Sequence, residues 1–248
     1  MKIILTSLLV FSTAALGAAP SGPVPGSLPA TVAPAVNSID RFDDSVRDDF
    51  FDGMLHGDQV AFDRGMKSCA DTLAKKPLYA PALSWQGCGF LYQSGHAFQA
   101  GDIQKGMDLW QRGLKEMNAA VDLQPENLQV IIPRGATFLG IAKYDPDRAE
   151  GRGLLKTGVA DFEKTLQREQ AIFATLSVHS RGELLSGLAS GYLQLGEREK
   201  ALPYLNQIIR DLPESAYATR ASELLLIADP AALKHKARAM SCIGCHTD

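Results

Sequence analysis

Residues 183–213 read ELLSGLASGYLQLGEREKALPYLNQIIRDLP, and this stretch gives the clearest indication of the fold class. In its first half, apolar side chains recur at steps of three, four and three residues, which is the spacing of one face of a helix. These side chains are Leu185, Leu188, Tyr192 and Leu195. Gly196 then interrupts the pattern, and a second helical stretch runs to Pro213. The stretch therefore predicts two helices joined by a tight turn.

The same spacing recurs elsewhere in the chain, and no alternating strand pattern competes with it. One stripe consists of Met107, Trp110, Leu114, Met117 and Val121, and another of Leu155, Val159, Phe162 and Leu166. Asp145-Pro146 and Asp229-Pro230 each place a capping side chain before a proline, which indicates that a helix begins there. We therefore expect an all-α fold.

The breaks between the helical stretches resemble one another. Residues 122–127 (DLQPEN) and 211–215 (DLPES) each close one amphipathic helix and open the next. The stretch from Glu183 to Pro213 also carries the spacing of the tetratricopeptide consensus, at Leu188, Ala189, Tyr192, Ala201, Leu205, Ile208 and Pro213. A weaker unit contains Trp85, Gly89, Tyr92, Leu114, Met117, Ala120 and Pro125. In these residues the chain resembles the tetratricopeptide-repeat (TPR) family.

The resemblance implies a fold and a mode of action. We expect an all-α helical-hairpin repeat array, a TPR-like α-solenoid, over residues 40–228, in which the small Ala189 and Ala201 let helices approach closely. Such families bind peptides or proteins on a concave face, and no catalytic residue comes with them. The resemblance thus implies a scaffold that docks a protein partner, and not an enzyme.

The N-terminus predicts export. Lys2 precedes an apolar run from Ile3 to Leu16, and small residues follow, so residues 1–17 are expected to be a secretory signal peptide, with an uncleaved anchor as the alternative. Residues 18–39 are rich in Pro, Gly and Ser and predict an extended linker. No later stretch is long and apolar enough for a membrane helix. We expect a periplasmic or secreted protein without an integral membrane span after cleavage.

Cys242-Ile243-Gly244-Cys245-His246 is typical of a c-type haem attachment site. The two thiols add to the haem vinyl groups, and the adjacent His246 is thereby placed as the proximal iron ligand. We therefore expect one covalent haem c on Cys242 and Cys245. The alternatives are a disulfide between these cysteines and a metal site with His235 as a fourth ligand.

The position of this motif near the end of the chain is similar to that in class II cytochromes c, although only Cys242, Cys245 and His246 match. We expect residues 229–248 to form a separable C-terminal helix and tail, because residues 214–228 already offer a helix that closes the array. The distal ligand is not determined by the sequence. His56, His96 and His179 are the candidates by elimination, and Lys234, Lys236 or Arg238 could pair with a haem propionate.

Cys69 and Cys88 are the remaining cysteines, an even number in an oxidising compartment. On the repeat interpretation, Cys69 lies on the second helix of one pair and Cys88 on the first helix of the next, which are packed neighbours. A disulfide between them is one interpretation, and two buried free thiols are the other.

Charge and motifs exclude several functions. The chain has 25 basic and 28 acidic residues, without the positive excess that binding to a phosphate backbone requires, so we expect no nucleic-acid partner. The sequence contains no G-x-S-x-G or H-E-x-x-H motif, so hydrolase chemistry has no support. The first hypothesis is a haem-carrying scaffold that passes electrons to or from a docked partner. The alternative is a haem-free periplasmic scaffold whose C-terminal cysteines form a disulfide or bind metal.

Overall fold

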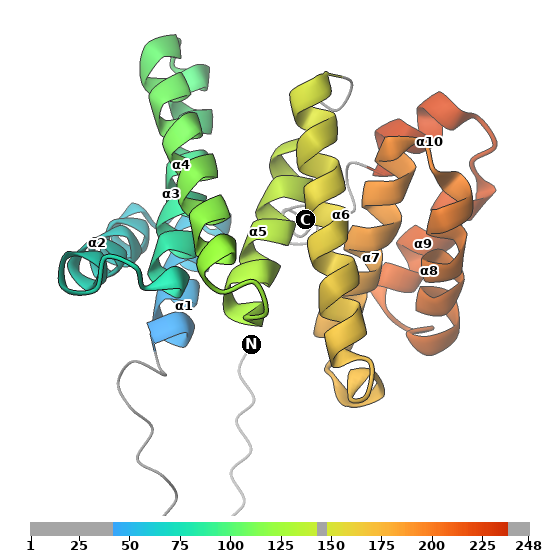
Figure 1. Ribbon diagram of the computed structural model, residues 1–248. Helices are drawn as coiled ribbons and strands as arrows, with labels where there is room; N and C mark the ends of the chain where they lie inside the picture. Colours follow the sequence, from blue (N-terminus) through green and yellow to red (C-terminus); the bar gives the residue numbers. More distant parts are fainter. Residues whose placement is uncertain (1–41, 143–147, 238–248) are drawn as a thin grey trace, which may run out of the picture. The chain divides into compact units, whose positions relative to one another are not determined.

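The computed structural model describes residues 42–142 and 148–237, where the chain forms ten α-helices and one 3-10 turn (Figure 1). No strand occurs in this part of the chain, so the expected all-α fold is confirmed. The elements are α1 (Phe42–Leu55), α2 (Gln59–Lys75), α3 (Ala80–Gln99), α4 (Ile103–Leu123), α5 (Leu128–Ala142), α6 (Ala149–Glu169), η1 (Phe173–Thr175), α7 (Val178–Leu195), α8 (Arg198–Asp211), α9 (Ala216–Leu226) and α10 (Pro230–Ala237). The predicted signal peptide, the linker and residues 242–246 lie outside the described residues.

Consecutive helices pack as pairs: α1 with α2, α3 with α4, α5 with α6, and α7 with α8. Glycine permits the close approach in two of these pairs. A Cβ atom on Gly87 of α3 would lie 2.8 Å from the carbonyl oxygen of Gly113 in α4, and one on Gly158 of α6 would lie 3.0 Å from that of Gly135 in α5. In α7 and α8, Ala189 and Ala201 are completely buried. Small residues therefore occupy the interior of the hairpins, as the sequence predicted for the last pair.

Three connections between pairs share one backbone geometry. In each, the residue that ends the helix has φ between −134° and −138°, and a proline follows it. These residues are Lys76, Gln124 and Leu212, followed by Pro77, Pro125 and Pro213. The carbonyl oxygen of the first residue accepts a hydrogen bond from the N–H three residues later, at 3.0 to 3.1 Å. The same helix–proline–helix connection thus recurs after α2, α4 and α8.

The turn inside the last hairpin also agrees with the sequence. Gly196 follows α7 with φ +80°, the left-handed conformation that favours glycine. Its N–H bonds the carbonyl oxygen of Leu193, and the N–H of Glu197 bonds that of Tyr192, at 3.1 and 2.8 Å. These bonds satisfy carbonyl groups that the end of α7 would otherwise leave without partners.

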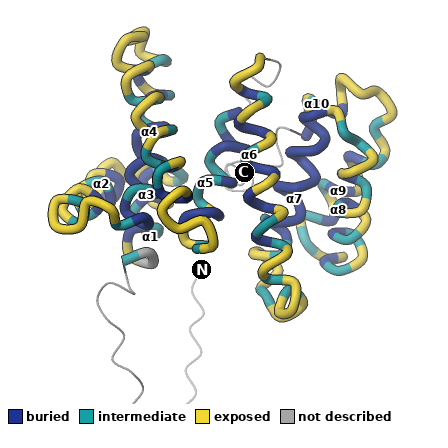
Figure 2. The backbone as a smooth tube through the Cα atoms, in the orientation of Figure 1, coloured by how far each residue is buried: buried dark blue, intermediate teal, exposed yellow. Residues whose placement is uncertain are grey.

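The described helices have more than one buried cluster. The largest joins α3 to α10, and a smaller one holds the rings of Phe50, Phe62 and Trp85 from α1, α2 and α3. Helix α7 is the most enclosed element, since every residue from Leu184 to Leu195 is buried (Figure 2). The sequence predicted a single apolar stripe on this helix. The residues of that stripe are buried, and the other faces of α7 are buried as well because α6, α8 and α10 cover the helix from several directions.

Helix α10 belongs to the same core. It begins at Pro230, as the sequence predicted, and the Asp229 carboxylate accepts a hydrogen bond from the N–H of Ala232 at 2.8 Å. It packs against α7 and α9, with Leu233 and Ala237 buried in the largest cluster. Residues 230–237 are therefore packed onto the helical unit, and the separability of the segment from residue 229 stays a prediction.

Candidate functional site

The residues expected to hold the haem, Cys242, Cys245 and His246, lie outside the described residues, and the nearest described element is the helix that precedes them. That helix is α10, which ends at Ala237. Cys242 follows Ala237 by five residues, and a fully extended chain spans at most about 3.6 Å per residue, so the two Cα atoms are at most about 18 Å apart. The position of Ala237 therefore limits how far from α10 the motif can lie.

Ala237 is held by a buried side chain of α7. The Ser190 hydroxyl donates a hydrogen bond of 2.7 Å to the Ala237 carbonyl oxygen, and the Ser190 oxygen accepts one of 3.0 Å from Nε2 of Gln194. Carbonyl groups in the last turn of a helix have no hydrogen-bond donor within that helix. The Ser190 hydroxyl is the donor for the carbonyl group of Ala237, at the end of α10. The base of the predicted haem tail is thus fixed to the middle of α7.

Two of the candidate distal ligands lie on the first helical pairs. His56 follows α1, is exposed, and has Nδ1 3.2 Å from Oδ1 of Asp52. His96, on α3, is also exposed, and its ring packs edge-on against that of Tyr92 with the centroids 4.6 Å apart. Neither α1 nor α3 is among the helices against which α10 chiefly packs. The structure therefore does not bring these two histidines to the anchored end of the tail.

His179 lies on the helix that holds the tail. It is exposed in the first turn of α7, with Nδ1 3.1 Å from the hydroxyl of Tyr217, and that hydroxyl donates to Glu183 at 2.9 Å. A rise of 1.5 Å per residue places His179 about 16 Å along α7 from Ser190. Of the three candidates, His179 is the one on an element that α10 contacts.

The fourth histidine of the described residues, His235, is exposed on α10. Residues 42–142 and 148–237 contain no cluster of three or more His, Cys, Asp or Glu side chains arranged to hold a metal. A metal site on Cys242, Cys245 and His246 would involve ligands beyond these ranges, so it stays a prediction.

The cations proposed as partners of a haem propionate lie on α10 or just beyond it. Lys236 Nζ is 3.4 Å from a carboxylate oxygen of Glu223 on α9, and both side chains are about half exposed. Lys234 is partly buried, and Arg238 lies outside the described residues. Because an exposed ion pair is weak, Lys236 can exchange Glu223 for another carboxylate at little cost.

The structure places Cys69 and Cys88 on the helices that the sequence predicted. Cys69 lies on α2 and Cys88 on α3, which pack against each other, and both are free thiols. The Thr137 hydroxyl of α5 donates to the Cys88 sulfur at 3.3 Å. Burial raises the pKa of both thiols, and the reactive thiolate is correspondingly disfavoured. The disulfide between them stays a prediction.

A buried ion pair was missed at the sequence level. Nε and one terminal nitrogen of Arg134, on α5, donate to the two carboxylate oxygens of Asp161, on α6, at 2.8 and 2.7 Å. Burial raises the pKa of Asp161, and the hydrogen bonds and charge of Arg134 act in the opposite direction. Arg134 is the only charged residue in residues 128–142. A lone charge in an apolar helix requires a partner, and that signal could have predicted the pair.

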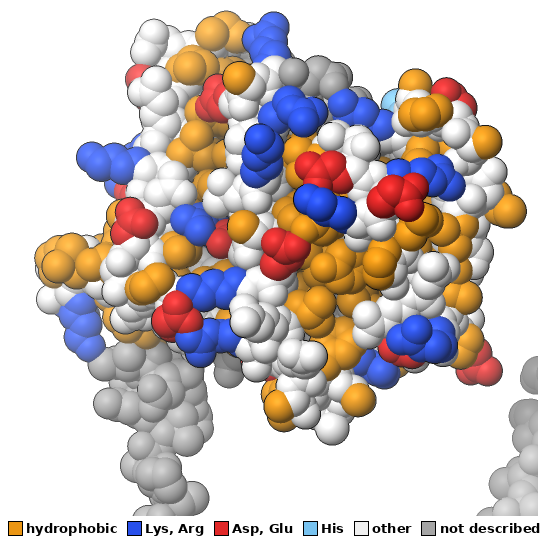
Figure 3. Space-filling view, turned by 45° about the vertical axis from the view of Figure 1, so that its right-hand side comes forward, with side chains coloured by type: hydrophobic (Ala, Val, Ile, Leu, Met, Phe, Trp, Pro, Cys, Tyr) orange, Lys and Arg blue, Asp and Glu red, His pale blue; other side chains and the backbone are white. Residues whose placement is uncertain are grey.

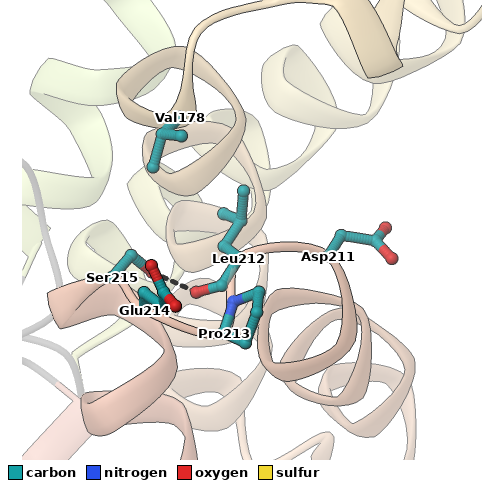
Figure 4. Close-up of a pocket in the computed structure, with 6 residues that line it drawn as sticks. All are labelled: Val178, Asp211, Leu212, Pro213, Glu214 and Ser215. Carbon is teal, nitrogen blue, oxygen red and sulfur yellow. Dashed lines mark hydrogen bonds between the residues drawn. The ribbon is translucent and has the colours of Figure 1, made fainter.

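The structure contains a pocket of about 280 Å³ at the connection between α8 and α9 (Figure 4). Its lining consists of Val178, Asp211, Leu212, Pro213, Glu214 and Ser215, and the Ser215 hydroxyl donates to the Leu212 carbonyl at 2.6 Å. A hydrogen bond from Arg210 lowers the pKa of Asp211. The lining offers neither a cysteine nor a histidine, so this pocket brings together no residue predicted for the haem site.

The surface in Figure 3 carries Lys and Arg side chains interspersed with Asp and Glu side chains around apolar areas. Among the described helices, none combines the length and apolar composition that a membrane crossing requires.

Comparison of the chain with models of protein families, with curated proteins and with solved structures gives no match. Function is therefore inferred from the residues of this chain alone.

Proposed function

We propose that this protein is an exported TPR-like scaffold that carries one covalent haem c and exchanges electrons with a docked periplasmic protein. The observation that carries the proposal is Cys242-Ile243-Gly244-Cys245-His246, in a chain that begins with the pattern of a signal peptide. Attachment of haem to such a motif takes place outside the cytoplasm, so the two features support each other.

The repeat character of the scaffold is supported by recurrence within the helical unit. The helix–proline–helix connections at residues 76–79, 124–127 and 212–215 repeat the same hydrogen bond with the same backbone geometry. Helices paired in sequence order are what a TPR-like array requires. We propose that the partner binds to such an array.

The proposed haem is held by residues of the tail. Cys242 and Cys245 would attach it, and His246 would be the proximal ligand; the bound group supplies one-electron redox chemistry. The fixed end of α10 supports this proposal, because Ser190 holds Ala237 and the chain length keeps the Cα atom of Cys242 within about 18 Å of that of Ala237.

The test is expression of the full-length protein together with a c-type haem maturation system. We expect a band that stains for haem on a denaturing gel and an alkaline pyridine haemochrome spectrum. The double variant Cys242→Ala/Cys245→Ala should abolish both. The matched control is Cys69→Ala/Cys88→Ala, which removes the other two cysteines and should keep the haem.

The same experiment decides between this proposal and a haem-free scaffold. The control is a cytochrome c that matures normally in the same cells. If the wild-type protein is colourless beside this control, the alternative is favoured, in which the C-terminal cysteines form a disulfide or bind a metal. If haem is attached, a reversible one-electron titration should follow. A haem that cannot be reduced and reoxidised in place would contradict electron transfer.

A further inference from the structure

Two tyrosine rings lie parallel to each other on the hairpin of α7 and α8. The rings of Tyr192, on α7, and Tyr204, on α8, make an angle of 4°, and their centroids are 6.1 Å apart. Tyr192 is 7% exposed, and Tyr204 is partly buried. The face of an aromatic ring carries partial negative charge and attracts cations. The hairpin therefore brings two cation-attracting rings together.

Two carboxylates lie near these rings. The Tyr192 hydroxyl donates a hydrogen bond to Glu163 of α6, and Glu163 is exposed to solvent. Glu197, which precedes α8, has a side chain that is 36% exposed. Burial and the nearby Glu163 carboxylate raise the pKa of both tyrosines, so both rings stay neutral at neutral pH. Negative charge and ring faces thus meet at one place on the surface, and both favour a cation there.

The chain's own Lys200 shows which kind of cation these residues hold. Its Nζ atom lies 5.4 Å from the centroid of the Tyr192 ring and 2.7 Å from a carboxylate oxygen of Glu197. The Lys200 side chain is 64% exposed, and an ion pair this exposed contributes less than about 1 kcal/mol. The ammonium group can therefore move into water at little cost. The ring and Glu197 are then open to another cation from the solvent side.

A cation over one ring is common in proteins, so the contact of Lys200 with Tyr192 does not by itself indicate a binding site. The second ring and Glu163 add to it. Glu163 accepts its hydrogen bond from a neutral group, the Tyr192 hydroxyl, so its negative charge remains available to a cation. Three helices contribute to this arrangement: α6, α7 and α8.

We infer that the two rings and the Glu163 carboxylate form a binding site for the side-chain ammonium of a lysine on the docked protein partner, which takes the place of Lys200. Small molecules bind in concave sites that enclose them, whereas Glu163 and Lys200 are open to solvent. A lysine has a flexible four-carbon stem that reaches such a surface from a separate protein. The inference rests on the proposed function for the existence of a protein partner, and it requires no haem.

The test is titration of the full-length, haem-free protein with Nα-acetyl-lysine methylamide, followed by NMR of carbon-13-labelled tyrosine rings. We expect saturable shifts of the Tyr192 and Tyr204 signals. The matched probe is Nα-acetyl-norleucine methylamide, which has the same side-chain carbons without the ammonium group and should give no saturable shift. Tetramethylammonium chloride, at the same ionic strength, tests a small quaternary amine.

Variants of the site test the roles of the ring and the carboxylate. Tyr204→Leu removes one ring and should weaken lysine binding about three- to tenfold, whereas Tyr204→Phe keeps the ring and should bind within about twofold of the wild type. Glu163→Gln should weaken binding about two- to fivefold. Circular dichroism verifies that each variant is folded.

Lys200→Met gives an effect of opposite sign. It vacates the Tyr192 ring and should strengthen lysine binding about two- to fivefold. The matched control is Lys76→Met, which removes the same charge and another cation–ring contact, 5.8 Å from the centroid of Tyr79. This control should leave the affinity unchanged. Lysine binding that Lys200→Met does not strengthen would contradict the replacement of Lys200.

Tyrosine signals that do not respond to the lysine probe would overturn the inference. Tetramethylammonium bound about tenfold more tightly than the lysine probe would also overturn it, because the ligand would then be a small quaternary amine. Neither result bears on haem attachment, which the stained gel decides. A protein that never binds haem and still binds lysine at these rings would support the inference and contradict the proposed function.

Discussion

The guanidinium of Arg134 and the carboxylate of Asp161 form a two-bond ion pair that joins α5 to α6 with only 13% and 7% of the side chains exposed. Asn118 of α4 adds an acceptor for the same guanidinium at 3.2 Å. Three helices from two neighbouring pairs are therefore joined through one cation. The pair gives the contact between α4, α5 and α6 a defined register that apolar packing alone would not supply.

We expect Arg134→Met to destabilise the protein by about 3 to 5 kcal/mol at pH 7, because it leaves a buried carboxylate without its counter-charge. Without Arg134, the pKa of Asp161 rises further in the folded state. A carboxyl group whose pKa is raised in the folded state stabilises the fold below its unfolded-state pKa, and this stabilisation is lost as pH rises. The destabilisation caused by Arg134→Met should therefore shrink toward pH 4. Urea denaturation of the wild type and the variant at pH 7 and at pH 4 measures this difference in unfolding free energy.

The control for this pair is Lys67→Met, which breaks an ion pair with Asp71 whose side chains are 72% and 58% exposed. It should have little effect, since exposed pairs contribute less than about 1 kcal/mol. The double variant Arg134→Met/Asp161→Leu should recover most of the loss. A double variant no more stable than Arg134→Met would show that the pair is not the origin of the effect.

The second prediction concerns the close approach of α3 and α4. A Cβ atom at Gly87 would lie 2.6 Å from Cγ of Met117 and 2.8 Å from the Gly113 carbonyl oxygen. Gly87→Ala should therefore cost about 1 to 3 kcal/mol of unfolding free energy. Gly95 lies on the same helix with nothing within 4 Å of its Cβ position, so Gly95→Ala should be neutral or stabilising by up to about 1 kcal/mol. Equal effects of the two substitutions would contradict the packing argument.

The third prediction concerns Glu116, which is 14% exposed and has one carboxylate oxygen buried without a partner. Burial raises its pKa, whereas Arg112 and Lys115 act to lower it. Because the folded-state pKa is raised, Glu116 favours folding below about pH 4.3 and this contribution is lost as pH rises through the folded value. Glu116→Gln should flatten the pH dependence of the unfolding free energy in that window. The exposed Glu199→Gln should leave it unchanged.

The fourth prediction is that protein recovered from an oxidising compartment contains a Cys69–Cys88 disulfide. Closing a loop of about 19 residues should stabilise the fold by roughly 3 kcal/mol in the chain-entropy model. Mass spectrometry of the unreduced, alkylated protein should find the two cysteines linked, and reduction should lower the thermal midpoint. Two alkylated thiols in that sample would contradict the pairing and leave Cys88 bonded to Thr137, as in the structure.

The helices were predictable because each depends on local information. The spacing of Leu185, Leu188 and Tyr192 is visible within one stretch, and Gly196 and Pro230 mark boundaries that the structure retains. The placement of Cys69 and Cys88 on neighbouring helices followed from the repeat interpretation. The haem motif is equally local, since its chemistry requires contiguous residues.

Contacts between distant helices were not predictable in this way. The bond between Ser190 and Ala237 depends on where α10 crosses α7, and no spacing in the sequence determines that crossing. For the same reason Ser186, Ser190 and Gln194 gave no signal, because small polar residues at this spacing are also typical of a solvated helix face. Their burial is a consequence of the fold around α7.

The last prediction tests whether α10 stabilises the helical unit. Leu233 is 4% exposed in the largest buried cluster, so Leu233→Ala should cost about 2 to 5 kcal/mol of unfolding free energy, the range for a leucine truncated in a core. The matched control is Leu226→Ala at the end of α9, where the leucine is 85% exposed and the same substitution should change little. Urea denaturation of the full-length variants gives both values. If Leu233→Ala were as mild as Leu226→Ala, α10 would contribute no stability and the tail would be separable at residue 229, as the sequence alone suggested.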